Sequence, residues 1–406
     1  MPGSLSNLRE NVRTMPSAAW VLLAGTFVNR LGTFVLPFIT LYLTRRGFSA
    51  PQAGLAVAMY GLGGFAAQLF GGLLTDRIGR RKAIGFSMLG AAALTLVLWQ
   101  VNTLAVIYPV MVLLALVAEL HRPAASALIV DLLPSDRRVT AFAMFRLAIN
   151  IGWACGLALG GLLADRSFDY LFIGDAATSA AFGVISLVAL PHGVRTSRHE
   201  ERELAGATRS ILADKGLLLF LGAVLIGAAI YMQNVSTFAL HVREAGHSNA
   251  AYGGLQALNG VIVVLLELPI TAWTGTRSRT PVVAVGVLLT GLAFASLAVA
   301  TTIPALIAMV FVWTIGEIVA APVISAFVAD RSPEHARGRY QAVLGAMFAL
   351  GGIIGPILGT VVYAVDPDTL WIGCGVAGVV AAGVALAAGR YPTPALRIVE
   401  ADASLT

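Results

Sequence analysis

The sequence predicts an all-α membrane protein, with twelve transmembrane helices in two pseudo-symmetric six-helix bundles. Three observations predict this fold class. The 406 residues are 58% hydrophobic and only 12% charged, with a mean hydropathy of +0.83, whereas a soluble domain carries about 25% charged residues. Twelve apolar runs are each long enough to cross a bilayer, which takes about 20 residues. Matching residues also recur 199 positions apart in the two halves of the chain.

The apolar runs alternate with short polar turns along the whole chain. The predicted spans are residues 17–43, 51–74, 81–101, 104–132, 139–164, 168–190, 215–241, 249–273, 281–300, 304–330, 336–363 and 369–389. The expected organisation is an N-terminal segment 1–16, a first bundle 17–190, a polar linker 191–214, a second bundle 215–390 and a tail 391–406.

Positive charge orients these spans. Twenty Lys and Arg residues fall in the termini, the linker and the turns on one side, and four fall on the other side. Because loops rich in Lys and Arg stay in the cytoplasm, we expect a multi-pass protein of the inner cell membrane with both termini cytoplasmic. The same distribution accounts for the net charge of +6 and argues against a nucleic-acid partner, which would need a basic stripe.

An internal repeat relates the two halves. When the sequence is shifted by 199 residues, six residues of the first half align with identical residues of the second half. Those of the first half are Pro123, Ser126, Ala127, Asp131, Pro134 and Arg138, and they align with Pro322, Ser325, Ala326, Asp330, Pro333 and Arg337. A weaker echo relates residues 71–77 to residues 160–166, at the ends of spans that run in opposite directions. Inverted repeats nested inside two parallel halves are typical of transporter architecture.

The turn between the second and third spans carries a specific motif. Residues 71–82 read Gly-Gly-Leu-Leu-Thr-Asp-Arg-Ile-Gly-Arg-Arg-Lys. This ordered spacing resembles the loop between helices 2 and 3 of the major facilitator superfamily of transporters. The resemblance implies a cytoplasmic gate in which the acid and the arginines latch helix ends. The gate residues would be Gly72, Asp76, Arg77, Gly79, Arg80 and Arg81, with Asp131 as the partner of Arg80 or Arg138.

Six ionisable residues stand out at membrane depth, where insertion costs roughly 2.5–3.5 kcal/mol for each. They are Arg30, Glu119, Arg122, Arg146, Glu267 and Glu317. Glu119 and Arg122 are three residues apart and share a helix face, so they form either a neutralised structural pair or part of a functional site. Glu267 is equally open: it is either a buried carboxylate bonded to Arg277 or Arg279, or a proton site.

The resemblance also implies a central site, because helices 1, 4, 7 and 10 of the superfamily line a cavity. Arg30, Glu119, Arg122 and Glu317 would then face one site. Glu317 has no basic residue nearby in its own helix, so it is the first proton-coupling candidate, followed by Glu119 and Glu267. Candidates for the substrate cavity are Arg30, Arg122, Arg146, Asn29, Tyr231, Asn234 and Trp313.

The length, the twelve spans and the segment Trp313–Glu317 resemble the twelve-helix drug:proton antiporter branch of the superfamily. This resemblance implies a monomer that exports lipophilic or cationic small molecules by alternating access, with the proton gradient rather than a cofactor as its energy source. The alternative is a proton-coupled symporter or importer of a polar or anionic metabolite, which Arg30 and Arg122 would suit.

Other classes of protein are disfavoured. An enzyme is disfavoured because the sequence has no HExxH, P-loop or Gly-x-Ser-x-Gly motif. No metal site is expected, because Cys155 and Cys374 both lie in apolar runs, where cysteine is typically a small buried hydrophobe. A channel is disfavoured because the charges of the two halves are inequivalent and form no ring.

Overall fold

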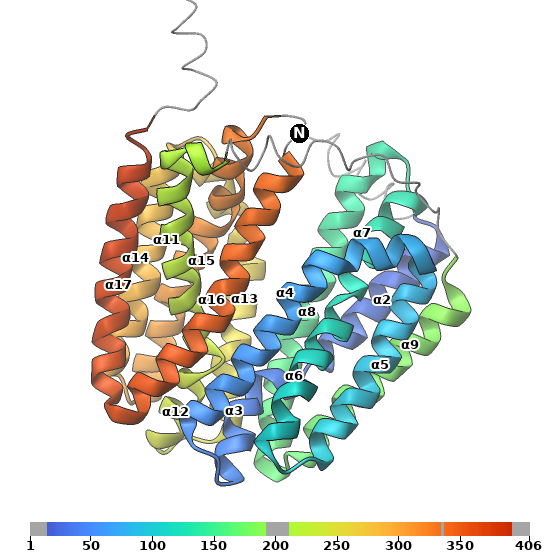
Figure 1. The fold of residues 1–406 in the computed structure, drawn as a ribbon, viewed down its shortest axis with the longest axis horizontal. Helices are drawn as coiled ribbons and strands as arrows, with labels where there is room; N and C mark the ends of the chain where they lie inside the picture. The colour runs from blue at the N-terminus through green and yellow to red at the C-terminus, as the bar shows by residue number, and fades with distance from the viewer. Residues whose placement is uncertain (1–13, 192–210, 334–336, 392–406) are drawn as a thin grey trace, which may run out of the picture. The chain divides into compact units, whose positions relative to one another are not determined.

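The computed structural model describes residues 14–191, 211–333 and 337–391, and it describes no side chains for residues 71–77, 135, 136 and 139. Every regular element in these ranges is a helix (Figure 1). The elements are α2 (Ser17–Leu31), α3 (Val35–Arg45), α4 (Ala50–Ile78), α5 (Arg80–Gln100), α6 (Leu104–Glu119), α7 (His121–Leu132), α8 (Ser135–Arg166), α9 (Asp169–Ala189), α11 (Lys215–Tyr231), η1 (Met232–Asn234), α12 (Thr237–Glu244), α13 (Asn249–Thr274), α14 (Arg279–Ala295), η2 (Ser296–Ala298), α15 (Ile303–Arg331), α16 (Arg337–Val365) and α17 (Pro367–Ala388).

Within the described ranges, twelve helical stretches are long and apolar enough to cross a bilayer. Four of these stretches combine consecutive elements: α2 with α3, α6 with α7, α11 with η1 and α12, and α14 with η2. The twelve stretches coincide with the twelve predicted apolar runs, so the all-α fold class is confirmed. A bilayer favours this outcome, because helices satisfy every backbone N–H and C=O within one segment.

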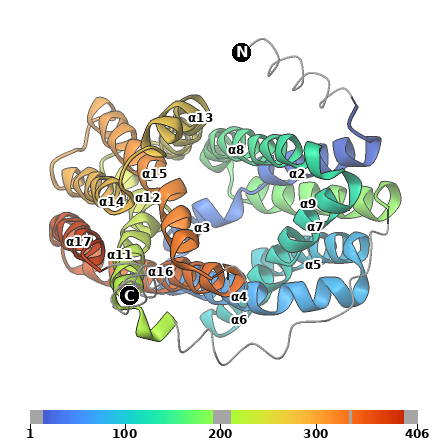
Figure 2. The same cartoon turned by 90° about the horizontal axis from the view of Figure 1, so that it is seen from above.

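The chain forms two compact units. The first contains residues 1–197 and 246–264, and the second contains residues 198–245 and 265–406. Within the first unit, α5 packs along α9, α4 along α6, and α2 along α8 (Figure 2). Within the second unit, α14 packs against both α15 and α17, and α11 packs against α16 and α17.

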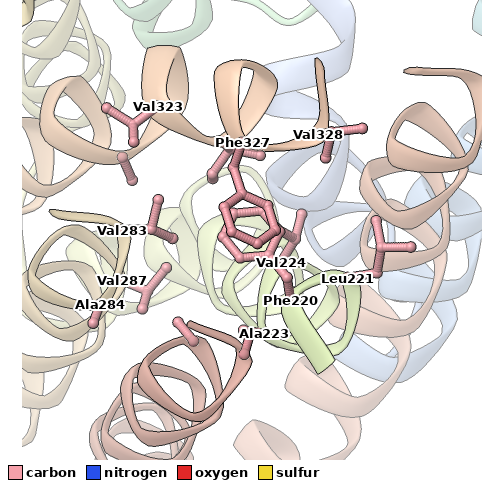
Figure 3. Packing of buried hydrophobic residues seen from close by; sticks show 14 of the residues in the cluster. Phe220, Leu221, Ala223, Val224, Val283, Ala284, Val287, Val323, Phe327 and Val328 are labelled. Carbon is pink, nitrogen blue, oxygen red and sulfur yellow. The ribbon is translucent and has the colours of Figure 1, made fainter. Parts of the chain in front are cut away.

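Each unit has its own apolar core. In the second unit, Phe220 of α11 stacks on Phe327 of α15 with ring centroids 3.9 Å apart, beside Val283 and Val287 of α14 (Figure 3). In the first unit, Leu22, Leu128 and Phe182 are fully buried in the corresponding cluster. Because lipid is as apolar as these side chains, close packing rather than removal from water holds such helices together. Cys374 is buried as predicted, but Cys155 is exposed, so its predicted burial is wrong.

The internal repeat is visible in the backbone. Gly47 follows α3 with φ +89°, and Gly246 follows α12 with φ +86°. The two glycines are 199 positions apart. A positive φ of this kind is readily adopted only by glycine, so both halves turn at the same repeat position by the same backbone conformation.

The first and seventh spans are both interrupted. Helix α2 ends at Leu31 and α3 begins at Val35. Pro37 explains this break, because the ring of a proline clashes with the carbonyl four residues earlier, here that of Thr33. The seventh span is interrupted at the matching place by η1, between α11 and α12, and Ser236 stands there in place of the proline.

A second proline breaks the fourth span. Helix α6 ends at Glu119 and α7 begins at His121, two residues before Pro123. Pro123 removes the N–H that would otherwise bond the Glu119 carbonyl. The matching Pro322 lies inside α15, which continues from Ile303 to Arg331. The interruption of the helix at Glu119 therefore belongs to the first half alone.

Two carboxylates cap helix starts in the second unit. Asp214 accepts the Leu217 amide at 3.0 Å and also forms a bidentate ion pair with Arg331, with N···O distances of 2.8 and 2.9 Å. This pair joins the start of α11 to the end of α15. Asp366 accepts the hydroxyl and the amide of Thr369 at the start of α17, and these hydrogen bonds hold the pKa of its carboxyl below the usual range.

Candidate functional site

The charge pair predicted in the fourth span lies in the first unit. Arg122 Nε is 2.7 Å from a carboxylate oxygen of Glu119. The Glu119 side chain is 17% exposed, whereas that of Arg122 is 58% exposed. The carboxylate thus lies inside the unit, and its charge is neutralised by a guanidinium that lies nearer the surface.

Arg30 lies beside this pair, near the end of α2. It is 8% exposed, and its Nε has no hydrogen-bond partner among the described residues. Both Glu119 and Arg122 are close enough to Arg30 to interact electrostatically with it. Helix α8 covers the arginine closely, because a Cβ at Gly152 would lie 2.8 Å from the Arg30 Cβ. A buried guanidinium with an unused N–H is costly, so this group is a candidate for binding an acceptor.

A cavity of about 50 Å³ opens between these side chains. Its polar lining consists of Asn29, Arg30, Thr33, Tyr60, Thr95, Glu119, His121, Asp175 and Ser179. The volume accommodates one or two water molecules, since one water occupies about 30 Å³ in the liquid. The structure therefore brings together three of the predicted residues, Asn29, Arg30 and Glu119, with Arg122 bonded to the last of them.

The acid and the histidine of this cluster were not among the residues predicted from the sequence. Asp175 of α9 accepts the Val35 amide at 3.2 Å and lines the cavity. His121 is 4% exposed, and its Nδ1 lies 2.5 Å from the Ala118 carbonyl oxygen, which fixes this nitrogen as a donor. The signal for Asp175 was an acid inside a predicted span, and the signal for His121 was its place next to Glu119 and Arg122.

Glu317 lines a separate cavity of about 200 Å³ in the second unit. The lining is largely apolar, with Val224, Met232 and Phe348 among its members, and Glu317 is the one carboxylate in the described lining. The Tyr231 hydroxyl lies 3.4 Å from a Glu317 oxygen, a long contact that is weak as a hydrogen bond. The expectation that Glu317 shares one site with Arg30 stays a prediction.

Two further predicted cavity residues support Tyr231 rather than line the cavity. Trp313 is 1% exposed, and its ring meets the Tyr231 ring edge-on with centroids 5.9 Å apart. Asn234 donates its amide to the Tyr231 carbonyl at 2.7 Å, within the break of the seventh span. Arg146, which is exposed on α8, and Glu267 on α13 are absent from the described lining of both cavities. Their predicted roles stay predictions.

The predicted gate turn contains an ion pair whose arginine is buried. Arg80, the first residue of α5, pairs with Asp131 near the end of α7, and it also donates to the Ala127 carbonyl at 3.1 Å. Gly79 precedes it with φ +85°, a conformation that the glycine of the motif supplies. Arg138 instead bonds the Leu133 and Val130 carbonyls at the end of α7. Of the two predicted partners, Asp131 therefore binds Arg80.

The other gate residues add less. The side chains of Gly72, Asp76 and Arg77 lie outside the described residues, and Arg81 is partly buried. The second half repeats the ion pair 199 positions later, where Arg279 Nε lies 3.2 Å from Asp330. The equivalent of the Asp76 position is Gly275. The ion pair is therefore common to both halves, whereas the acid of the motif occurs in the first half alone.

These features define a class of protein. Twelve potential spans, a repeated half and two cavities lined by ionisable groups are typical of a secondary transporter. The sequence pattern of the Major Facilitator Superfamily matches residues 22–264 and 219–403. The chain belongs to this superfamily, whose members are transporters rather than enzymes.

Known proteins resemble the chain over most of its length. A Na(+), Li(+), K(+)/H(+) antiporter of Planococcus maritimus is 25% identical, over 87% of this chain and 89% of the relative. Multidrug resistance protein MdtH of Edwardsiella ictaluri is 24% identical, over 89% of this chain and 92% of the relative. The solved structure of a point mutant of the nucleoside transporter NupG superposes with a TM-score of 0.81 at 17% identity, over 91% of this chain and 99% of that one. This last likeness shows the fold alone.

Proposed function

We propose that the protein is a proton-coupled antiporter that exports lipophilic or cationic small molecules from the cell. The observation that carries this proposal is the position of Glu317, the one carboxylate in the described lining of an apolar cavity of about 200 Å³. Pockets for small molecules are mainly apolar with a few polar groups that orient the ligand. A single carboxylate in the wall of such a pocket suits a ligand with an apolar body and a positive charge.

The chemistry of Glu317 supplies a coupling mechanism. An ionised carboxylate in a medium of low dielectric is costly unless a counter-charge neutralises it. A proton and a cationic substrate can each neutralise Glu317, but they compete for the same carboxylate. Binding of the substrate therefore releases the proton, and loading of a proton releases the substrate, which is the exchange that an antiporter requires. The names of two relatives, a cation/H(+) antiporter and a multidrug resistance protein, support this direction.

The alternative is proton-coupled uptake of a polar or anionic metabolite. The observation that favours it is Arg30, which is buried beside the smaller cavity and whose Nε has no partner among the described residues. A guanidinium is well suited to a carboxylate or phosphate group of a ligand. An anionic substrate would bind in the first unit, whereas a cationic one would bind beside Glu317.

The proposal includes a topology. We place the protein in the inner membrane with cytoplasmic termini, because of the asymmetry of its Lys and Arg residues, and we propose that it acts as a monomer. The bundles 17–190 and 215–390, joined by the linker 191–214, would alternate between inward- and outward-facing states. In this arrangement the Arg80–Asp131 pair would hold the cytoplasmic ends of α5 and α7 together as part of the gate.

The Glu317→Gln variant tests the mechanism. Glutamine keeps the shape of the side chain and a polar contact for Tyr231, but it binds no proton. We expect proton-driven accumulation of ethidium in inside-out vesicles to fall to background, while counterflow exchange of ethidium without a gradient continues at a higher KM, because the cation has lost its counter-charge.

A second variant controls for the loss of any carboxylate bonded to a tyrosine. Glu244 accepts the Tyr363 hydroxyl at 2.7 Å and is absent from the described lining of the Glu317 cavity. Glu244→Gln is therefore expected to leave driven transport near the wild-type level. Full proton-driven transport by Glu317→Gln would remove Glu317 from the mechanism.

A further inference from the structure

Asp175 is a partly buried carboxylate for which the proposed function has no role. It lies on α9, seven residues into the helix, and its carboxylate receives the Val35 amide at 3.2 Å. The amide of Phe34 and the hydroxyl of Ser179 also face this carboxylate. Asp175 therefore binds the first N–H groups of α3, the second half of the interrupted first span.

This carboxylate caps the second half of the broken span. The first N–H groups of a helix have no partner inside the helix, and Phe34, the residue that precedes α3, offers no side-chain cap. A negative charge at this end is also stabilised by the helix dipole. Helix α9 reinforces the contact, since Ser179 accepts the Asn29 amide at 3.2 Å from the other side of the break. The state of Asp175 is thus coupled to the geometry of the broken span.

The carboxylate also faces the cavity of about 50 Å³. The charged and titratable groups around it come from four other elements: Arg30 on α2, Tyr60 on α4, Glu119 on α6, and His121 and Arg122 on α7. Among the described residues, Arg30 Nε has no hydrogen-bond partner. Two carboxylates and one buried arginine therefore border a space that holds one or two water molecules.

The second half of the chain shows that the break needs no acid. The residue 199 positions after Asp175 is Cys374, which is buried. Neutral groups bond the backbone at the break in the seventh span: Gln233 donates to the Ala229 carbonyl at 3.0 Å, and Asn234 donates to the Tyr231 carbonyl at 2.7 Å. The residue 199 positions after Arg30 is likewise neutral, Ala229. The fold therefore does not require an ionisable residue at this position, and the first half has one while the second half does not.

We propose that Asp175 is a proton-binding site that controls the break in the first span. When ionised, the carboxylate holds the amides at the start of α3. When a proton arrives through the cavity, one carboxylate oxygen becomes a hydroxyl donor and the hydrogen bonds from Asp175 to the amides of α3 weaken. Glu119 is then the ionised carboxylate that remains near Arg30. The role in transport rests on the proposed proton coupling, whereas binding of the proton by Asp175 does not.

Infrared difference spectroscopy of the protein in lipid, between mildly acidic and alkaline buffer without substrate, tests proton binding directly. Asp175→Asn keeps an oxygen that accepts the Val35 amide but cannot be protonated. We expect the carboxylic-acid band that titrates in the wild type to lose one component in this variant. Asp169→Asn is the matched control on the same helix, because Asp169 is exposed and accepts the Trp99 indole N–H at the start of α9, away from the cavity.

The outcomes separate the two proposals. An unchanged band in Asp175→Asn would show that Asp175 is a permanent structural cap and would overturn the inference. If Asp175→Asn does not fold, the same infrared measurement is made on Asp175→Cys, which has the residue found at the matching position of the second half. The pH profile of transport gives the second readout, and it is expected to flatten in Asp175→Asn. Failure of the wild type to couple transport to protons would contradict the proposed function alone, since the infrared band would still report on Asp175.

Discussion

At the scale of single residues, the same Arg–Asp ion pair occurs once in each half of the chain, and the two pairs differ in how far their side chains are exposed. The side chains of Arg80 and Asp131 are 10% and 15% exposed, whereas those of Arg279 and Asp330 are 33% and 60% exposed. Removing one partner of a buried pair leaves a charge without compensation, but an exposed charge remains solvated. The repeat thus supplies two ion pairs that have the same residue types and differ in side-chain burial.

We predict that Asp131→Ala destabilises the protein far more than Asp330→Ala. Loss of a buried partner costs about 3 kcal/mol of unfolding free energy, and loss of an exposed partner costs about 0.2–1 kcal/mol. Thermal unfolding of both variants in the same detergent measures the difference. Equal shifts in Tm would show that burial does not set the strength of this pair.

Sequence reasoning at the residue scale succeeded where partners are close along the chain. The spacing of Glu119 and Arg122 was enough to predict their contact, and Asp131 was expected to pair with Arg80 or Arg138, of which the structure shows the first. It missed the pair of Asp214 with Arg331, because 117 positions separate them and only the packing of α11 against α15 reveals their proximity. It missed Asp175 for the same reason, since the amides that it binds belong to the first span.

At the scale of elements, the start of α13 is bound tightly to α8 within the first unit. Asp165 accepts the amides of Asn249 and Ala250 at 2.8 and 3.0 Å, which caps α13. One turn further along, a Cβ at Gly253 would collide with the Leu157 carbonyl and lie 2.9 Å from the Gly161 Cα. Small residues that let two backbones approach are the usual basis of helix packing in membranes.

The next residue of α13 provides a matched control for a test of this contact. No atom lies within 4 Å of a Cβ built at Gly254. We predict that Gly253→Val forces the two helices apart and costs about 1–3 kcal/mol, with loss of transport, whereas Gly254→Val changes stability by less than about 0.5 kcal/mol. Thermal unfolding and ethidium transport of the two variants measure this difference. Similar behaviour of both variants would contradict the close approach of α8 and α13.

At the scale of the whole molecule, the sequence predicted the twelve spans and the repeat because both signals extend over many residues. A bilayer admits few alternatives to an apolar helix, so hydropathy alone locates the spans. The breaks at Leu31 and Glu119 were not predicted, although Pro37 and Pro123 were visible. A proline in a membrane helix is tolerated as a kink or opened into a break according to which neighbouring groups satisfy the freed backbone, and those groups are known only from the packed structure.

The central claim is that substrate and proton move in opposite directions through one protein. The most direct test records the internal pH of acid-loaded proteoliposomes while tetraphenylphosphonium is added outside. The account predicts a rise of internal pH as the cation enters and protons leave, and no rise in vesicles that carry Glu317→Gln. Proton movement in the same direction as an added anionic metabolite, with no response to the cation, would contradict antiport and favour coupled uptake.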